Sequence, residues 1–274
     1  RVDKKRDLAR APDVRPLKIG NKVLGAIGVA TTKGAPPLDS EERALLDTLC
    51  EQAAAALRWL EAPQHHLLMW DAAIYPAFTP AVREAMAGTG VKVATVVNFP
   101  DGSDDAARIT RETRRAIAAG ADEIDLVLPY RALIEGRTDA ARRGVDACRE
   151  VCGPRTTLKL ILETGELASP ARIRAACRIG LTAGVDFLKT STGKVAINAT
   201  LDAAAIMLDE IAAGRGLCGF KAAGGIRTLA AAQAYVALAE ERLGADWVTP
   251  EHFRIGASGL FADIAAALAA TPDA

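Results

Sequence analysis

The sequence has no surplus of charge of either sign, and this limits the classes of partner. Its 274 residues carry 34 basic and 34 acidic side chains, for a formal net charge of zero. Proteins that bind nucleic acid or anionic membranes generally need an excess of basic residues to meet the phosphates. We therefore expect neither as a main partner, whereas a small anionic substrate in a local basic pocket remains compatible with this composition.

Long apolar runs, histidines and paired cysteines are also scarce. No run of about 18 uninterrupted apolar residues predicts a transmembrane helix, and no apolar stretch follows the basic N-terminal residues as in a secretory signal. Five cysteines are an odd number without disulfide-like spacing, which indicates reduced thiols in a cytoplasmic protein. The three histidines are scattered, and Cys148 and Cys152 have no further ligands nearby, so we expect no metal.

What the chain does contain is apolar material in a repeated pattern. Apolar residues make up 50% and charged residues 25% of the composition, as in an ordinary globular protein. From about residue 66 onward, short β-rich runs alternate with stretches of helical periodicity, such as residues 103–119 and 170–183. The predicted strands are residues 71–75, 91–99, 123–128, 157–163, 187–192, 219–223 and 253–257.

This alternation predicts an α/β protein, either a (β/α)8 TIM barrel or a doubly wound parallel sheet. The barrel is favoured because no GxGxxG motif follows an early strand. Polar residues also follow several different strands, at the end where barrel active sites lie. A closed barrel needs eight strands, so residues 63–274, taken as the barrel domain, lack one strand–helix unit.

The first 62 residues form a separate block. Residues 22–29 (KVLGAIGV) predict a strand. Residues 40–60 predict a helix that begins at a capping-box-like pair, Asp39 and Glu42, and carries one apolar face. One strand and one helix bury no core of their own, so other elements must cover this block.

Lys189 is the first candidate for chemistry, because it ends the apolar part of DFLKTSTGK. A strand-end position places its amine inside or at the mouth of a barrel. Burial disfavours the charged form of a lysine, and a neutral amine is the nucleophile that forms a Schiff base with a carbonyl group. The alternative is a lysine whose stem lies along the strand end while its charge reaches water.

Two further residues favour the catalytic interpretation. Lys221, in GFKAAGG, ends the next strand. Adjacent strands lie about 5 Å apart, so each cation disfavours the charge on the other. Asp125 lies inside an apolar run, where a carboxylate needs a cation or hydrogen bonds. It is either an acid/base group or half of a structural ion pair, while Asp122 and Glu123 are expected to face solvent.

Glycine-rich loops follow the late strands, where barrels commonly bind phosphate. Glycine lets backbone N–H groups approach an anion, and hydroxyl or amine side chains add contacts. A single glycine pair marks only a tight turn, but three such loops beside two strand-end lysines predict a phosphate site. The candidate residues are Thr192, Gly193, Lys194, Gly224, Gly225, Gly256 and Ser258.

Six segments together resemble the deoxyribose-phosphate aldolase family over residues 71–268: KTSTGK, GFKAAGGIRT, DEIDLVLPYRALIEG, ATVVNFPDG, AIYPAF and RIGAS. The resemblance implies a cytoplasmic (β/α)8 barrel of deoxyribonucleotide catabolism, often a homodimer, that needs no metal or organic cofactor. It implies a lyase that reversibly cleaves 2-deoxy-D-ribose 5-phosphate into D-glyceraldehyde 3-phosphate and acetaldehyde. By this resemblance Lys189 is the Schiff-base lysine, Lys221 the second lysine and Asp125 the acid/base carboxylate.

The chain departs from this family at its N-terminal side. The family's first strand carries an Asp that helps order the active site, and residues 22–30 contain no acidic residue. Residues 1–62 instead resemble the C-terminal end of a GAF sensor domain. Either residues 22–29 and 40–60 occupy the missing first unit and close the barrel, or they pack elsewhere and leave it open.

Two other functions therefore remain as alternatives. One is a Schiff-base aldolase that acts on another phosphorylated sugar, since the replaced first strand changes the pocket. The other is a barrel that serves as a binding or signalling module without catalysis. The joint presence of Lys189, Lys221 and Asp125 favours an enzyme.

Overall fold

The computed structural model describes residues 13–19, 22–29, 71–88, 90–257, 260 and 263–264. For the first two of these ranges only the backbone is described. The chain divides into two compact units, one of residues 1–72 with 84–91 and a larger one of residues 73–83 with 92–274. The larger unit contains nearly all of the main sheet and the candidate site.

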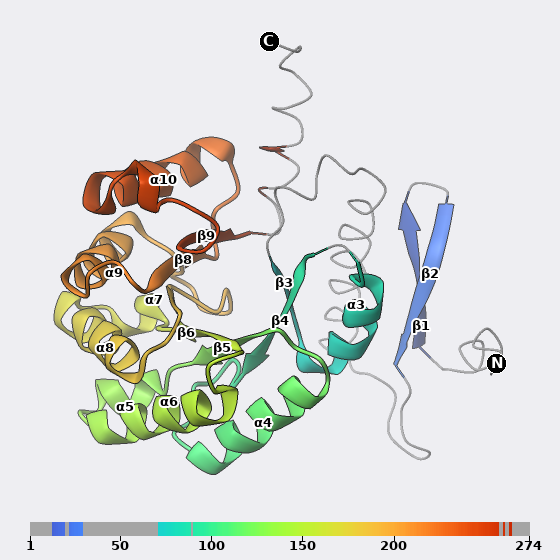
Figure 1. Ribbon diagram of the computed structural model, residues 1–274, viewed down its shortest axis with the longest axis horizontal. Coiled ribbons are helices and arrows are strands. Elements are labelled where there is room, and N and C mark those ends of the chain that lie inside the picture. The colour runs from blue at the N-terminus through green and yellow to red at the C-terminus, as the bar shows by residue number, and fades with distance from the viewer. Residues whose placement is uncertain are drawn as a thin grey trace, which may run out of the picture. The chain divides into compact units, whose positions relative to one another are not determined.

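In the main sheet, from β3 through β9, neighbouring strands are consecutive in the chain. Every pair from β4–β5 to β8–β9 is parallel. The sheet curls, and helices lie along its outer side (Figure 1), so the protein has a TIM-barrel-like α/β fold. The strands are β3 Asp71–Ile74, β4 Lys92–Val97, β5 Glu123–Val127, β6 Thr157–Ile161, β7 Phe187–Lys189, β8 Gly219–Ala223 and β9 Phe253–Gly256.

Four of the described outer helices begin after a capping side chain. Asp105, Ser169, Thr200 and Thr228 each accept a hydrogen bond from a backbone N–H in the first turn of the helix that follows. The α-helices are α3 Thr79–Ala85, α4 Ala106–Ala118, α5 Tyr130–Ile134, α6 Thr138–Cys152, α7 Thr164–Leu167, α8 Pro170–Ala183, α9 Leu201–Ala213 and α10 Leu229–Leu243, with 3₁₀ turns η2 Pro76–Phe78 and η3 Ala245–Trp247.

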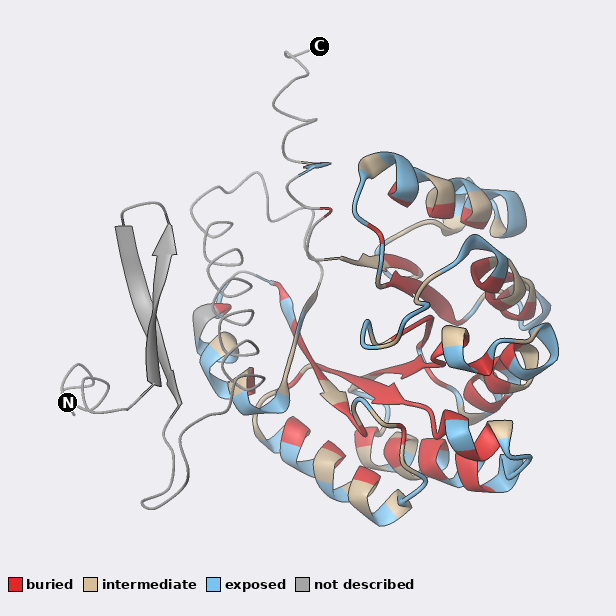
Figure 2. Cartoon of the chain, turned by 180° about the vertical axis from the view of Figure 1, so that it is seen from behind, coloured by how far each residue is buried: buried red, intermediate tan, exposed pale blue. Residues whose placement is uncertain are grey.

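Close packing of helices on the sheet fixes the positions of the strand ends. At Gly180 of α8, an added Cβ would lie 2.8 Å from a methyl carbon of Leu188 and 2.9 Å from one of Leu160. Only glycine lets α8 approach β6 and β7 this closely. Strands β5 to β8 are buried along almost their whole length (Figure 2), including every residue of β5 and β8.

The seven predicted strands of the barrel domain and the predicted helices at residues 103–119 and 170–183 are all present among the described residues. Strand β8 and helix α8 have the predicted bounds, and the other elements are somewhat shorter than predicted. Strand β6 ends at Ile161 rather than at Glu163, because Glu163 has left-handed backbone angles, φ 57° and ψ 59°. Such a backbone conformation ends a strand. In the described part of the chain, no helix has the length and apolarity needed to span a membrane.

The N-terminal strand prediction is also confirmed, with an unexpected partner. Strand β2 (Lys22–Val29) pairs antiparallel with β1 (Asp13–Ile19) in a separate two-stranded sheet. No pairing between described residues joins β2 to the main sheet, so the hypothesis that it closes the barrel gains no support from the strand pairing. The predicted helix at residues 40–60 lies outside the described residues.

Candidate active site

The strand register brings the predicted catalytic residues to one face of the sheet. Asp125 of β5 pairs with Lys159 of β6, and Lys189 of β7 pairs with Lys221 of β8. Lys189 also pairs with Ile161, two residues after Lys159, and side chains two apart on a strand share a face. The carboxylate and the three amines therefore line the same inner surface.

Asp125 is the centre of this cluster. Its side chain is fully buried, and each carboxylate oxygen contacts a different lysine. Lys159 Nζ lies 2.7 Å from Oδ1, and Lys189 Nζ lies 2.7 Å from Oδ2. The burial of Asp125 is thus compensated by two cations, and the group that contacts Lys189 is a carboxylate able to exchange a proton with it.

Glu123 extends the cluster and corrects one prediction. It was expected to face solvent, but it is 2% exposed. Its carboxylate lies 2.6 Å from Lys159 Nζ and 2.9 Å from Arg254 Nη1. The prediction was wrong because Glu123 is the first residue of β5 and, two positions before Asp125, shares its inward face. Asp122 is the more exposed residue and pairs with Arg83 at the surface.

Sequence reasoning missed Lys159, Arg254 and Glu163. Lys159 is the one charged residue within the apolar segment LKLIL, the same kind of signal that singled out Asp125. Arg254 pairs with Lys221 in the β8–β9 register, and its guanidinium lies 4.3 Å from the centre of the Phe187 ring. Arg254 forms an ion pair with Glu123, and Glu123 forms one with Lys159, so the buried charges make a continuous series.

Three glycines of the predicted phosphate site have left-handed backbone conformations. Gly193, Gly224 and Gly225 have φ angles of 83°, 85° and 82°. The space beside Gly193 and Gly225 is open, whereas a Cβ at Gly224 would lie 2.7 Å from Asn198. Two open, left-handed glycines near the strand ends leave room for an anion to approach the backbone.

Of the remaining phosphate candidates, Gly256 and Lys194 lie among the described residues. A Cβ at Gly256 would lie 3.2 Å from Lys221 Cε, which places β9 directly beside that lysine side chain. The Lys194 amine lies 5.9 Å from the centre of the Tyr75 ring. Ser258 lies outside the described residues.

Thr192 has its donor groups engaged inside the protein. Its hydroxyl lies 2.5 Å from Glu163 Oε2, and its backbone N–H donates to Oε1 of the same carboxylate at 3.2 Å. The hydroxyl also accepts a hydrogen bond from Lys194 N–H at 3.0 Å. The role of Thr192 as a direct phosphate ligand remains a prediction, and its observed contacts are with Glu163, after β6, and with Lys194.

The burial that comes with these contacts disfavours the charged form of the Glu163 carboxyl, so its effect on stability depends on pH. Burial raises the pKa of the Glu163 carboxyl above its ordinary value of 4.5, against hydrogen bonds from Thr192 and the charge of Lys189, which lower it. An acid with a raised pKa in the folded state binds its proton more tightly than in the unfolded chain. The folded state therefore loses stability as pH rises from the ordinary pKa through the raised one.

We accordingly expect the stability of the wild type relative to Glu163→Gln to decline as pH rises from about 4 to 7. The glutamine has the same shape and does not titrate in this range. The measurement is urea unfolding of both proteins at several pH values. A wild-type advantage that grows with pH would contradict the raised pKa.

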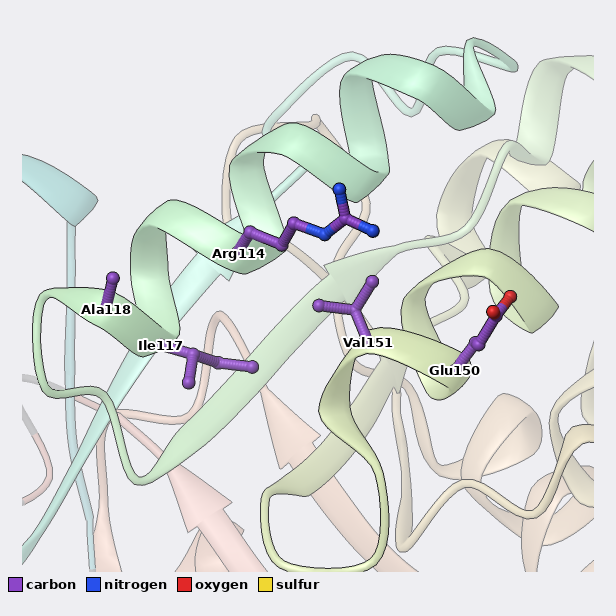
Figure 3. Close-up of a pocket in the computed structure, with 5 residues that line it drawn as sticks. All are labelled: Arg114, Ile117, Ala118, Glu150 and Val151. Carbon is purple, nitrogen blue, oxygen red and sulfur yellow. The ribbon is translucent and has the colours of Figure 1, made fainter.

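A surface hollow elsewhere contains none of these residues. It lies between α4 and α6 (Figure 3) and is lined by Arg114, Ile117, Ala118, Glu150 and Val151. Both helices lie on the outer side of the sheet, whereas the charged cluster lies on its inner face. The carboxyl ends of the strands, rather than this hollow, are the candidate active site.

Comparisons with known proteins agree with the fold. A family model for DeoC/LacD family aldolases matches residues 72–262. A proposed deoxyribose-phosphate aldolase from Coccidioides immitis has 27% identity and a TM-score of 0.68, with 80% of this chain and 79% of that chain covered. One from Toxoplasma gondii ME49 has 27% identity and a TM-score of 0.68, with 74% and 82% covered. The tetrameric deoxyribose phosphate aldolase from Aeropyrum pernix, at 20% identity and a TM-score of 0.59, shares the fold.

The fold and the family model together define an aldolase built on a TIM-barrel-like sheet. More particularly, the chain belongs to the DeoC/LacD family of aldolases.

Proposed function

We propose that the chain is a Schiff-base aldolase that reversibly cleaves 2-deoxy-D-ribose 5-phosphate into D-glyceraldehyde 3-phosphate and acetaldehyde. The observation that carries this proposal is the contact of Lys189 Nζ with the buried Asp125 carboxylate at 2.7 Å. Support for the substrate comes from family membership and from the two 27% identical structures of proposed deoxyribose-phosphate aldolases.

In the proposed reaction the Lys189 amine adds to the C1 aldehyde, and loss of water gives a protonated imine. A base removes the proton of the C3 hydroxyl, the C2–C3 bond breaks, and its electron pair moves toward the imine nitrogen. The products are D-glyceraldehyde 3-phosphate and an enamine on Lys189. Protonation of the enamine at C2 and addition of water then release acetaldehyde and the free amine.

Asp125 is the proposed carrier of these protons, directly or through a water molecule. It lies against Lys189, and its second oxygen is held by Lys159, so its position is fixed by contacts on both sides. Lys221, which pairs with Lys189 in the strand register, is the proposed second amine.

The proposed phosphate site consists of the loops after β7, β8 and β9. Gly193 with Lys194, Gly224 with Gly225, and Gly256 follow or end three adjacent strands. Holding the phosphate there positions the reacting carbons at a distance from the charge, so that remote binding orients the C2–C3 bond.

The test is turnover of 2-deoxyribose 5-phosphate by the purified chain, measured as release of D-glyceraldehyde 3-phosphate. Reduction with borohydride in the presence of acetaldehyde is expected to leave an N-ethyl group on Lys189, located by peptide mass mapping. Trapping without turnover would point to another phosphorylated aldehyde. If the folded protein shows neither trapping nor turnover, the Schiff-base proposal is overturned.

A further inference from the structure

A buried acid, Glu163, lies immediately after the end of β6 and is not used in the proposed reaction. Its side chain has no measurable exposure, and its backbone is left-handed, with φ 57° and ψ 59°. A residue other than glycine keeps this backbone conformation only where surrounding contacts fix it. Both features indicate that surrounding contacts fix the position of this carboxylate.

The contacts of Glu163 lead directly to the loop after β7. Its two oxygens accept the backbone N–H and the hydroxyl of Thr192, and that hydroxyl in turn accepts the N–H of Lys194. Thr192 follows the proposed Schiff-base lysine by three positions and precedes Gly193 and Lys194. One carboxylate therefore fixes the backbone that leads from the lysine to the proposed phosphate site.

Neighbouring residues hold the same two segments together. Thr164 N–H donates to the Thr190 carbonyl at 3.0 Å, and Leu162 N–H donates to the Lys189 carbonyl at 2.9 Å. At Gly165, an added Cβ would lie 1.9 Å from the Ile197 carbonyl oxygen. The backbone after β6 and the backbone after β7 are thus in direct contact over several residues.

We infer that Glu163 is a positioning residue that sets the affinity for the phosphorylated end of the substrate by fixing the loop of residues 190–194. The inference rests on the proposed function and deepens it. Glu163 acts through Thr192 and does not touch the reacting carbons, so its loss affects phosphate binding and leaves imine formation intact. The charged groups that act on the carboxylate are Glu166, on the same segment, and Lys189 on β7.

The experiment compares 2-deoxyribose 5-phosphate with 2-deoxyribose, which has the same reacting carbons and no phosphate. Glu163→Gln and Thr192→Val are each expected to raise KM for the phosphorylated sugar about tenfold, the usual effect of losing a hydrogen bond to a charged group, with kcat nearly unchanged. The KM for 2-deoxyribose and the rate of borohydride trapping with acetaldehyde stay at the wild-type values. Thr192→Ser, which restores the hydroxyl, recovers most of the affinity that Thr192→Val loses.

A double variant separates positioning from direct binding. If Glu163 acts through Thr192, the KM of Glu163→Gln/Thr192→Val equals that of either single variant. Independent effects multiply instead, and multiplied effects would overturn the inference. Glu166→Gln is the matched control, because Glu166 is an exposed acid on the same segment, and its KM is expected to stay at the wild-type value.

Failure of the inference is distinguishable from failure of the proposed function. A wild type that binds both sugars equally well would contradict the phosphate site itself. If the wild type prefers the phosphorylated sugar and the Glu163→Gln and Thr192→Val variants keep that preference, only the role of Glu163 is contradicted. Because Thr192 is only partly buried, its variants remain usable even where replacement of the buried Glu163 impairs folding.

Discussion

Replacing Lys189 by methionine is expected to abolish borohydride trapping and to lower turnover at least about a thousandfold, because no other group then supplies the electron-accepting imine. Methionine has a similar length and fills the same space without an amine. Asp125 keeps its 2.7 Å contact with Lys159 in this variant, so the carboxylate is not left without a cation and the chain is expected to fold. Trapping, turnover and the circular-dichroism spectrum are the measurements.

The matched controls are methionine at each of the other two buried lysines. Lys159 and Lys221 are 0% and 2% exposed and lie on the same inner face. Lys159→Met and Lys221→Met are expected to keep the label on Lys189 while turnover falls, because both lysines act on the surroundings of the nucleophile. Label on Lys159 or Lys221 in the Lys189→Met protein would show that the nucleophile is misassigned.

The strand order and most of the site follow from local patterns in the sequence. Continuous apolar runs predict buried parallel strands, and the charged residue inside such a run marks an inward position, as at Asp125. Lys189 and Lys221 each end a run, and parallel pairing of adjacent strands brings such ends together. These features are predicted from the residue pattern within each strand and from the order of the strands in the chain.

Which residues become neighbours depends on the register between strands, and the pattern of a single strand does not specify that register. Lys159 becomes a neighbour of Asp125 only when β5 and β6 align as observed. Arg254 reaches Glu123 from 131 residues away, across the interior of the curled sheet. The contact between Glu163 and Thr192 depends on the left-handed backbone of Glu163, after β6. Position 163 is not a glycine, so the sequence gives no sign of that conformation. Tertiary packing decides all three contacts.

Asp125→Asn is expected to have the second large effect, on both stability and activity. The substitution keeps the shape and removes the negative charge that lies between two buried lysines. Loss of one partner of a buried ion pair costs about 3–5 kcal/mol, since it leaves charge uncompensated. Urea unfolding of the wild type and the variant measures this loss of stability.

The same variant decides between the two roles that the sequence left open for Asp125. If the carboxylate carries protons, turnover falls about 10²–10⁴-fold while acetaldehyde is still trapped on Lys189. If Asp125 is only half of a structural ion pair, stability falls and turnover per folded molecule does not. Asp122→Asn serves as the control, because Asp122 pairs with Arg83 at the surface and exposed pairs contribute roughly 0–1 kcal/mol. A buried carboxylate held at 2.7 Å from two amines is arranged for both roles, so a loss of turnover and of stability together is the expected result.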